Sequence, residues 1–415
     1  MDMDEIWNYG FAYNISTGLI PYKDFNMVIT PLYPLCIAFL MIIFGKNIVI
    51  FHIINAIICT FIFYYLKKYT KNIYYLIYLV LLPLTLPNYN IACLLLLYVL
   101  ITLEKENKND YLIGLFLGIT FLTKQSIGIY LFIPSLFTKD IKKILKRIIG
   151  FIIPNIIILI YLIYNKALYD FINYTFLGMK SFAKENYTLS INPITLLIPI
   201  IICTLIYKYL KTKDNMILYL LCFFGMSYPI FDTYHTIIPL LPAIAYSIKD
   251  ISLNKKLFMI TFYLFISILF ITQAYTFKNK NYIYPNTTNL LKYRMLDNNT
   301  VSGINTLSNY YKNNPGRTFI IELDAYLIKL NTNTKIDKYD LLNDGNLGKG
   351  GIKQIIKEFD KICSKDKCTF LIYKETLNSN RHTQYNEEIY HYVMNNYQES
   401  GKILSLTIYK NHWQF

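Results

Sequence analysis

Charged residues are scarce in this sequence. Only 16% of its 415 residues are Asp, Glu, Lys or Arg, whereas 54% are hydrophobic and the mean hydropathy is +0.32. Soluble globular domains carry about 25% charged residues, so this composition excludes most soluble enzymes. The apolar residues form long runs from Thr30 to Phe277, and residues 278–415 have the composition of a soluble domain. The sequence therefore predicts a mainly α, polytopic membrane protein with a C-terminal soluble α/β domain.

Arginine is rare, and the positive charge has no single dominant segment. The arginines are Arg147, Arg294, Arg317 and Arg381. The net charge is +15, yet residues 1–277 hold 22 Lys and Arg against 13 Asp and Glu, and residues 278–415 hold 19 against 13. Much of the excess lies in short links between apolar runs, where it orients a membrane protein. This distribution argues against a nucleic-acid partner.

Cysteine and histidine form no metal-binding pattern. The seven Cys and five His contain no CxxC motif and no Cys/His spacing typical of zinc sites. Five cysteines lie in apolar runs, where Cys behaves as a small hydrophobe. Cys363 and Cys368 flank a short polar link. They either form a disulfide in an extracytoplasmic domain or are two thiols at a helix end and a strand start.

Ten apolar segments approach the length of a membrane span, which is about 20 residues with roughly 17 tolerated. The predicted spans are 47–66, 72–87, 89–103, 111–124, 126–138, 148–165, 192–210, 216–231, 234–249 and 257–275. Two neighbouring pairs are separated only by Pro/Asn or Lys/Gln breaks. Short spans beside polar breaks predict helices that stop inside the membrane around a cavity.

Lysine placement sets the predicted orientation. When the apolar stretch 31–45 lies in the interface, alternate links between spans hold 16 Lys and Arg. The opposite links hold only four, which are Lys124, Lys166, Lys180 and Lys184. The positive-inside rule places the basic links in the cytoplasm. Residues 1–46, the 166–191 loop, the Asp232–His235 link and residues 278–415 are then extracytoplasmic.

Three parts follow from this orientation. Residues 1–46 are an extracytoplasmic segment with in-plane helices, 47–277 the transmembrane helical domain, and 278–415 the soluble domain. Because residues 1–30 are acidic and must be placed outside, we expect one further helix upstream of them. The soluble domain alternates predicted elements, which is typical of a small α/β layer fold. These elements are helices 302–313, 352–363 and 384–398 and strands 318–323, 369–373 and 403–409.

The N-terminal acidic cluster is the most distinctive local feature. Asp2, Asp4 and Glu5 lie beside Trp7 and Tyr9. Trp and Tyr anchor proteins at the membrane–water boundary, and a carboxylate held at the mouth of a helix bundle can act as a general base. The alternative is a solvated acidic terminus.

The order of Asp4-Glu5, Gly18-x-x-Pro21-Tyr22-x-Asp24-Phe25 and Pro31-Leu32-Tyr33 resembles the GT-C superfamily of polytopic glycosyltransferases. That family includes bacterial aminoarabinose transferases of lipid A and protein O-mannosyltransferases. Its members carry an Asp-Glu pair in the first extracytoplasmic loop, followed by in-plane helices, and many have a C-terminal soluble domain. The resemblance implies a multi-pass protein of a bacterial plasma membrane. One departure is Ile29-Thr30, which stands where some members carry a phosphate-binding Lys.

This resemblance also implies a reaction. A sugar passes from a polyprenyl-phosphate donor to the hydroxyl of a lipid, glycan or protein acceptor, with inversion. Asp4 is then the general base, as in an inverting glycosidase. Glu5 orients the acceptor or binds a divalent cation, and Asp24 is a reserve for the base. No other cofactor is expected.

Two polar breaks on the predicted outer side supply candidates for binding the leaving phosphate. Lys124 interrupts two apolar runs and is followed by Gln125, a hydrogen-bond donor. An ionisable residue at membrane depth is a functional hypothesis, and the alternative is a Lys that snorkels from a helix end.

The second break is Asp232-Thr233-Tyr234-His235. His235 can donate to phosphate, while Asp232 holds it or helps to place the acceptor; alternatively Asp232 simply caps a helix. Lys23 and Lys180 are weaker candidates. The Gly-rich segment 345–351 lacks the Lys-Ser/Thr ending of a P-loop and is interpreted as a flexible helix start.

Two other classes of function compete with glycosyl transfer. A lipid-linked glycan flippase or transporter requires charged residues at span centres and repeat symmetry, and the sequence shows little of either. A glycan polymerase or ligase relies on Arg and His in an outer loop, and the outer membrane loops lack Arg. A glycosyltransferase predicts that Asp4, Lys124 and His235 converge on one outward-facing pocket.

Overall fold

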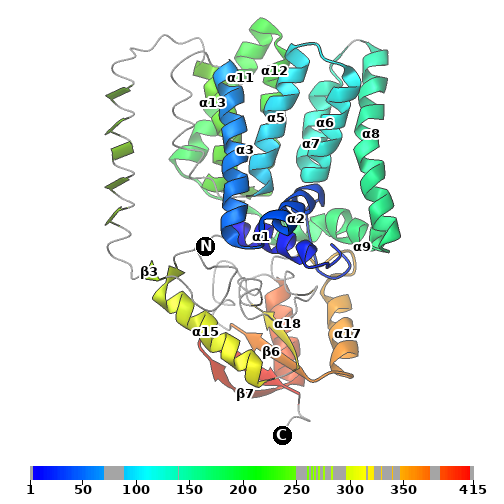
Figure 1. Ribbon diagram of the computed structural model, residues 1–415, viewed down its shortest axis with the longest axis vertical. Coiled ribbons are helices and arrows are strands. Elements are labelled where there is room, and N and C mark those ends of the chain that lie inside the picture. Colours follow the sequence, from blue (N-terminus) through cyan, green and yellow to red (C-terminus); the bar gives the residue numbers. More distant parts are fainter. Residues whose placement is uncertain are drawn as a thin grey trace.

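The computed structural model describes residues 3–69, 88–138, 140–248, 296–314, 316–321, 346–373 and 384–411, with isolated positions between 259 and 283 and at 329 and 339. The described chain is mainly helical, with a four-stranded sheet in its C-terminal part. The long helices form a bundle, α1 and α2 lie at one end of it, and the C-terminal part lies beyond them (Figure 1). The predicted span 72–87 and about half of 257–275 lie outside the described residues.

Apolar runs of the sequence form the helices of the bundle. These are α3 (Ile48–Tyr69), α5 (Tyr89–Lys105), α6 (Asp110–Thr123), α7 (Gln125–Ser135), α8 (Ile141–Tyr164), α11 (Pro193–Thr212), α12 (Asn215–Phe223) and α13 (Thr233–Ile248). Side-chain caps fix several starts. Asn88, Asn109, Asp140 and Asp214 each accept a hydrogen bond from a backbone N–H of the first turn, which satisfies donors that a helix start leaves unpaired.

Three helices among the described residues are long and apolar enough to cross a membrane, over Ile48–Lys68, Ile141–Tyr164 and Thr195–Thr212. The remaining predicted spans that the structure describes form shorter helices, so the prediction of about ten spans is supported for these three. The shortening has local causes. Lys124 is extended, with φ −153° and ψ 112°, and it separates α6 from α7. The 216–231 segment changes at Phe224 into the 3₁₀ helix η4 (Phe224–Ser227) and ends in strand β2 (Ile230–Phe231).

Helix α8 has one exposed apolar side and one side that packs against a neighbouring helix. One side exposes isoleucines at positions 149, 152, 153, 156, 157, 160 and 163, each between 43% and 63% exposed. A contiguous exposed apolar surface of this kind marks contact with lipid or with another protein. The other side packs against α6, and a Cβ at Gly114 would lie 2.1 Å from the Arg147 carbonyl oxygen. Small residues at this interface allow the two backbones to approach closely.

The N-terminal segment forms α1 (Met3–Ser16) and α2 (Leu32–Phe44), which lie across the end of the bundle (Figure 1). Tyr9 and Phe11 of α1 share a core with Ile37 and Met41 of α2 and with Phe51 of α3. That these helices lie in the membrane plane stays a prediction.

The C-terminal part contains a mixed sheet flanked by helices. Its strands are β5 (Arg317–Ile321), β6 (Cys368–Ile372), β7 (Gln398–Ile403) and β8 (Leu406–Lys410), in the order β5-β6-β8-β7. Strands β5 and β6 are parallel, whereas β8 is antiparallel to both of its neighbours. The helices are α15 (Asn298–Asn313), α17 (Gly351–Cys363) and α18 (Gln384–Asn396). Phe319, Phe359 and Phe370 lie in its core.

Two sequence expectations for this part have different outcomes. The single strand predicted at 403–409 is wrong, because the chain turns at Leu404 (φ 54°) and forms the β7–β8 hairpin. Leucine is unusual at positive φ, so the sequence carried no ordinary turn signal there. Of the two alternatives for Cys363 and Cys368, the structure contains the disulfide.

The Gly-rich segment joins the C-terminal part to the bundle. The Asn26 side chain donates to the Asn346 carbonyl (3.0 Å), and the Lys349 N–H donates to Asn173 Oδ1 (2.8 Å). Asn173 begins the π-helix η3 (Asn173–Leu177), which lies between α9 (Leu168–Ile172) and α10 (Met179–Glu185). Gly348 has φ +66°, and a Cβ there would lie 2.5 Å from Asn173 Nδ2, so this contact requires glycine.

Candidate functional site

Lys124 reaches from the break between α6 and α7 to the first turn of α5. Its Nζ donates to Asn90 Oδ1 (3.0 Å) and lies 5.2 Å from the centroid of the Tyr89 ring. Asn90 is fully buried, and its Nδ2 has no hydrogen-bond partner among the described residues. A buried amide donor without an acceptor is costly. Together with the neighbouring ammonium group, it is suited to an anionic ligand.

The Asp232–His235 break reaches the same turn of α5. The side chain of Asn88 hydrogen-bonds to the Tyr234 hydroxyl, and its Oδ1 accepts the Asn90 N–H (2.7 Å) to cap the helix. Strand β1 (Thr188–Leu189) pairs with β2 just before this break and ties it to the 166–191 loop. Lys124 and Tyr234, 110 positions apart in sequence, therefore converge on the start of α5.

Helix α1 also contacts this turn. Asn8 Oδ1 accepts the Tyr89 N–H at 3.4 Å, and Asn8 is almost fully buried. Asp4 precedes Asn8 by four residues, which on a helix is the same face one turn away. The backbone of Asp4 belongs to α1, and its side chain lies outside the part of the chain that the structure describes.

Asp232 and His235 interact mainly with each other. Asp232 Oδ1 lies 2.9 Å from His235 Nδ1 and accepts the His235 N–H at 2.8 Å. Partial burial alone would raise the pKa of Asp232, but the hydrogen bonds and charge of His235 outweigh it and hold the pKa below its usual value. The helix cap considered from the sequence is thus present, and it orients the imidazole ring.

Glu5 is paired with a histidine of α3. Its carboxylate is fully buried, and Oε1 lies 2.6 Å from His52 Nε2 of α3. A buried carboxylate needs such a partner. This pair attaches α1 to α3, so we assign Glu5 to positioning the helix that carries Asp4.

Asp24 and Gln125 do not join the group around α5. Asp24 Oδ2 accepts the Ile20 N–H (2.7 Å) and closes the turn that follows α1. Gln125 Nε2 donates to the carbonyls of Val28 (3.0 Å) and Thr175 (3.3 Å). Gln125 therefore joins α7 to the N-terminal segment and to η3, and the predicted pocket does not include it.

Asn8, Asn88 and Asn90 are candidate site residues that sequence reasoning missed, and Tyr33 of α2 is a further buried polar group. Tyr33 is buried, and its hydroxyl has no hydrogen-bond partner among the described residues. Burial, with smaller contributions from the neighbouring Cys59 and Cys93 thiols, raises its pKa and keeps the phenol protonated. The sequence did contain a signal, because two asparagines separate apolar runs at 88–90.

Among the described residues, no group of three or more His, Cys, Asp and Glu side chains could hold a metal ion. Comparisons with family models, curated proteins and solved structures find no match to this chain. The assignment of function therefore depends on the site itself.

Proposed function

We propose that this chain is an integral-membrane glycosyltransferase of the GT-C type. It transfers a sugar from a polyprenyl-phosphate donor to an acceptor hydroxyl at the membrane face beside the C-terminal part. The observation that carries the proposal is the Lys124 ammonium group next to the unused amide donor of Asn90, at the start of an apolar helix. These donors and the positive end of the helix dipole suit a phosphate whose apolar chain remains in the membrane.

Each residue of the proposed site has a separate role in the reaction. The carboxylate of Asp4 takes the proton of the acceptor hydroxyl while the acceptor oxygen attacks the anomeric carbon. The new carbon–oxygen bond forms as the bond from the anomeric carbon to the phosphate oxygen breaks, and the configuration inverts. The electron pair leaves with the phosphate, where Lys124 balances the added negative charge. Asn90 donates a hydrogen bond to a phosphate oxygen.

Several further features support this proposal. The Asp4-Glu5 motif lies on α1, which contacts the α5 start through Asn8. A disulfide between Cys363 and Cys368 fits an extracytoplasmic location for the C-terminal part. That location agrees with the side predicted from the lysine distribution.

The first test measures carrier binding by the full chain in nanodiscs, with tritiated undecaprenyl phosphate as the probe. A hydrogen bond to a charged group is worth about 1.5–3 kcal/mol, so Lys124→Met is expected to weaken binding by at least about tenfold. Lys184→Met is the matched control, because it removes the same charge from an exposed position of α10 on the same predicted side. Equal losses in the two variants would mean that general surface charge binds the carrier, and would contradict the proposal.

The second test separates chemistry from binding. Asp4→Asn should bind undecaprenyl phosphate normally but lose about 10²–10⁴-fold in transfer from a panel of polyprenyl-phosphate sugars, the usual contribution of a general base. Unchanged transfer in this variant would remove Asp4 from the mechanism. Movement of an intact lipid-linked sugar across a liposome bilayer, with no transfer, would instead identify a flippase or transporter.

A further inference from the structure

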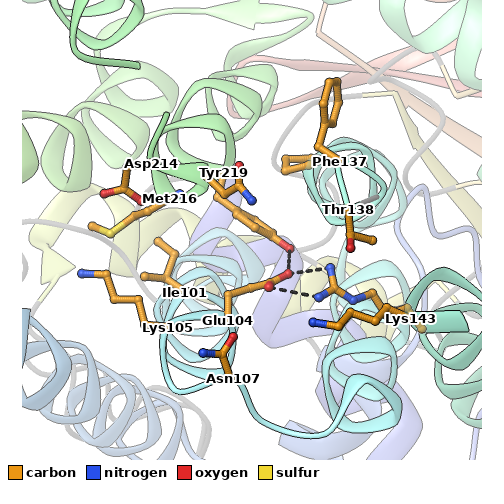
Figure 2. A pocket seen from close by; sticks show the side chains of 13 residues that line it. Ile101, Glu104, Lys105, Asn107, Phe137, Thr138, Lys143, Asp214, Met216 and Tyr219 are labelled. Carbon is orange, nitrogen blue, oxygen red and sulfur yellow. Dashed lines mark hydrogen bonds and ion pairs between the residues drawn. The ribbon is translucent and has the colours of Figure 1, made fainter. Parts of the chain in front are cut away.

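A cavity of about 390 Å³ lies among helix ends of the bundle (Figure 2). Figure 1 shows these helix ends on the side of the bundle away from the C-terminal part. The cavity is formed where α5 and α7 end and where α8 and α12 begin. Its polar lining includes Glu104, Lys105, Asn107, Thr138, Lys143 and Asp214. None of these residues belongs to the proposed glycosyl-transfer site.

Glu104 and Arg147 form an ion pair in the wall of this cavity. Arg147 donates to Glu104 Oε1 (2.7 Å), Glu104 Oε2 (3.0 Å) and Asp110 Oδ1 (2.8 Å). The Tyr219 hydroxyl donates to Glu104 Oε1 at 2.8 Å (Figure 2). The Ser135 carbonyl accepts a further bond from Arg147. Both carboxylates thus have donors within the fold, and this group of one guanidinium and two carboxylates carries a formal charge of −1.

The second carboxylate of the lining, Asp214, also accepts hydrogen bonds from donors within the fold. Asp214 Oδ1 accepts the Met216 N–H (3.0 Å) as the cap of α12, and its Oδ2 accepts the Tyr246 hydroxyl (2.8 Å). Among the described residues, the Lys143 side chain has no hydrogen-bond or ion-pair partner, and Figure 2 shows its ammonium group directed towards the cavity. The lining of this cavity holds three cationic side chains, Lys105, Lys143 and Arg147, against the two carboxylates Glu104 and Asp214, so its formal charge is +1.

A second cavity continues the positive surface. It also measures about 390 Å³, shares Glu104, Lys143 and Arg147 with the first, and adds Lys108, Lys146 and Asp110 to the lining. The two linings together hold five cationic side chains against three carboxylates. Beside these cavities the surface is apolar, because Phe137 is 61% exposed and Ile141 is 64% exposed. Lys143 thus lies where basic cavities meet apolar helix surfaces.

We propose that this site binds the phosphate of an anionic membrane phospholipid. Lys143 and Lys105 contact the phosphate, and Asn107 and Thr138 donate hydrogen bonds from the cavity wall. The acyl chains lie along the apolar surface that includes Phe137 and Ile141. Basic pockets between membrane helices bind anionic headgroups in this way. An inorganic phosphate shares the headgroup chemistry but gains nothing from the apolar surface, so the lipid is the expected ligand.

The test titrates the detergent-purified full chain with short-chain phosphatidylglycerol and follows binding by native mass spectrometry. Phosphatidylcholine and inorganic phosphate are the comparison ligands at the same concentrations. We expect phosphatidylglycerol to bind in preference to both. Lys143→Gln should weaken its binding about fivefold, since a lysine near an anionic membrane surface is worth about that factor.

Lys142→Gln is the matched control, because Lys142 is the neighbouring exposed lysine of α8 and lines neither cavity. It should bind phosphatidylglycerol as the wild type does. An equal loss in Lys142→Gln would overturn the site in favour of general surface charge. Equal binding of phosphatidylcholine would overturn the headgroup assignment, and equal binding of inorganic phosphate would overturn the lipid assignment.

Discussion

Gly114 offers a direct test of how α6 and α8 pack. A Cβ at this position would lie 2.1 Å from the Arg147 carbonyl oxygen and 2.8 Å from its carbonyl carbon and Cα. Ordinary contact begins at 3.4 Å, so Gly114→Ala requires one backbone to move by about 1.3 Å, the difference between these distances. Arg147 cannot move alone, because its side chain is held by Glu104 and Asp110.

Overpacking of this kind costs about 1–3 kcal/mol. We therefore expect Gly114→Ala to lower the free energy of local opening of α6 and α8 by about 2 kcal/mol. Peptide-resolved hydrogen exchange of the full chain in detergent measures this change, and amides of both helices should exchange about 30-fold faster.

Gly303→Ala is the control in α15. A Cβ at Gly303 would meet only the Leu404 Cδ1, at 3.6 Å. Replacing an unconstrained helical glycine by alanine stabilises by about 0.5–1 kcal/mol, so exchange in α15 should slow. Unchanged or slower exchange of α6 in Gly114→Ala would refute the close packing of α6 on α8.

Two predictions concern pH and redox state. Because the pKa of Asp232 is lowered in the fold, its stabilising contribution is complete above its unfolded pKa and is lost as the pH falls through the folded value. The thermal midpoint of wild type should exceed that of Asp232→Ala at pH about 5 and approach it below pH about 3.8; a difference that grows on acidification would contradict this. The Cys363–Cys368 disulfide closes a loop with a sequence separation of five, worth about 2 kcal/mol by loop-closure entropy. Cys363→Ser/Cys368→Ser should accordingly speed hydrogen exchange in α17, whereas exchange equal to wild type would exclude the cross-link.

Helix positions were predictable where apolar residues run without interruption. The segments 47–66, 148–165 and 192–210 correspond to α3, α8 and α11, which among the described residues are the three helices long enough to span. Helix α8 begins at Ile141, seven residues before the predicted start, because Asp140 caps a first turn of basic residues. The length of an apolar run does not include such a turn, because lysines extend a helix without adding apolar residues to it.

Site residues were less predictable than the helices, because side-chain direction depends on packing. Lys124 and Gln125 are adjacent in sequence, yet Lys124 contacts α5 whereas Gln125 contacts Val28 and η3. The change of backbone direction at the α6–α7 break separates them. Asn88 and Asn90 escaped notice because asparagine at a helix start is usually only a cap. Asn88 is such a cap, but the buried Asn90 amide is a feature of the folded bundle alone.

The convergence of distant polar breaks follows from helix lengths. Helix α5 has 17 residues and rises about 25 Å, and α6 returns with 14 residues and about 21 Å. The end of α6 therefore lies near the level of the α5 start, within reach of the Lys124 side chain. The nine residues of α12 and the four of η4 descend about 22 Å together. They bring the chain back to the same level just before Tyr234.

Helix α7 breaks this pattern and accounts for the cavity at the other end. Its 11 residues rise only about 16 Å from Lys124, about 5 Å less than α6. The chain leaves α7 before it reaches the level at which α5 ends and α6 begins, and it continues through Phe137 and Thr138, which line the cavity. Arg147 lies in the resulting gap and donates to the Ser135 carbonyl at the end of α7. The same polar break that brings Lys124 to the α5 start thus shortens α7 and opens the basic site at the opposite end of the bundle.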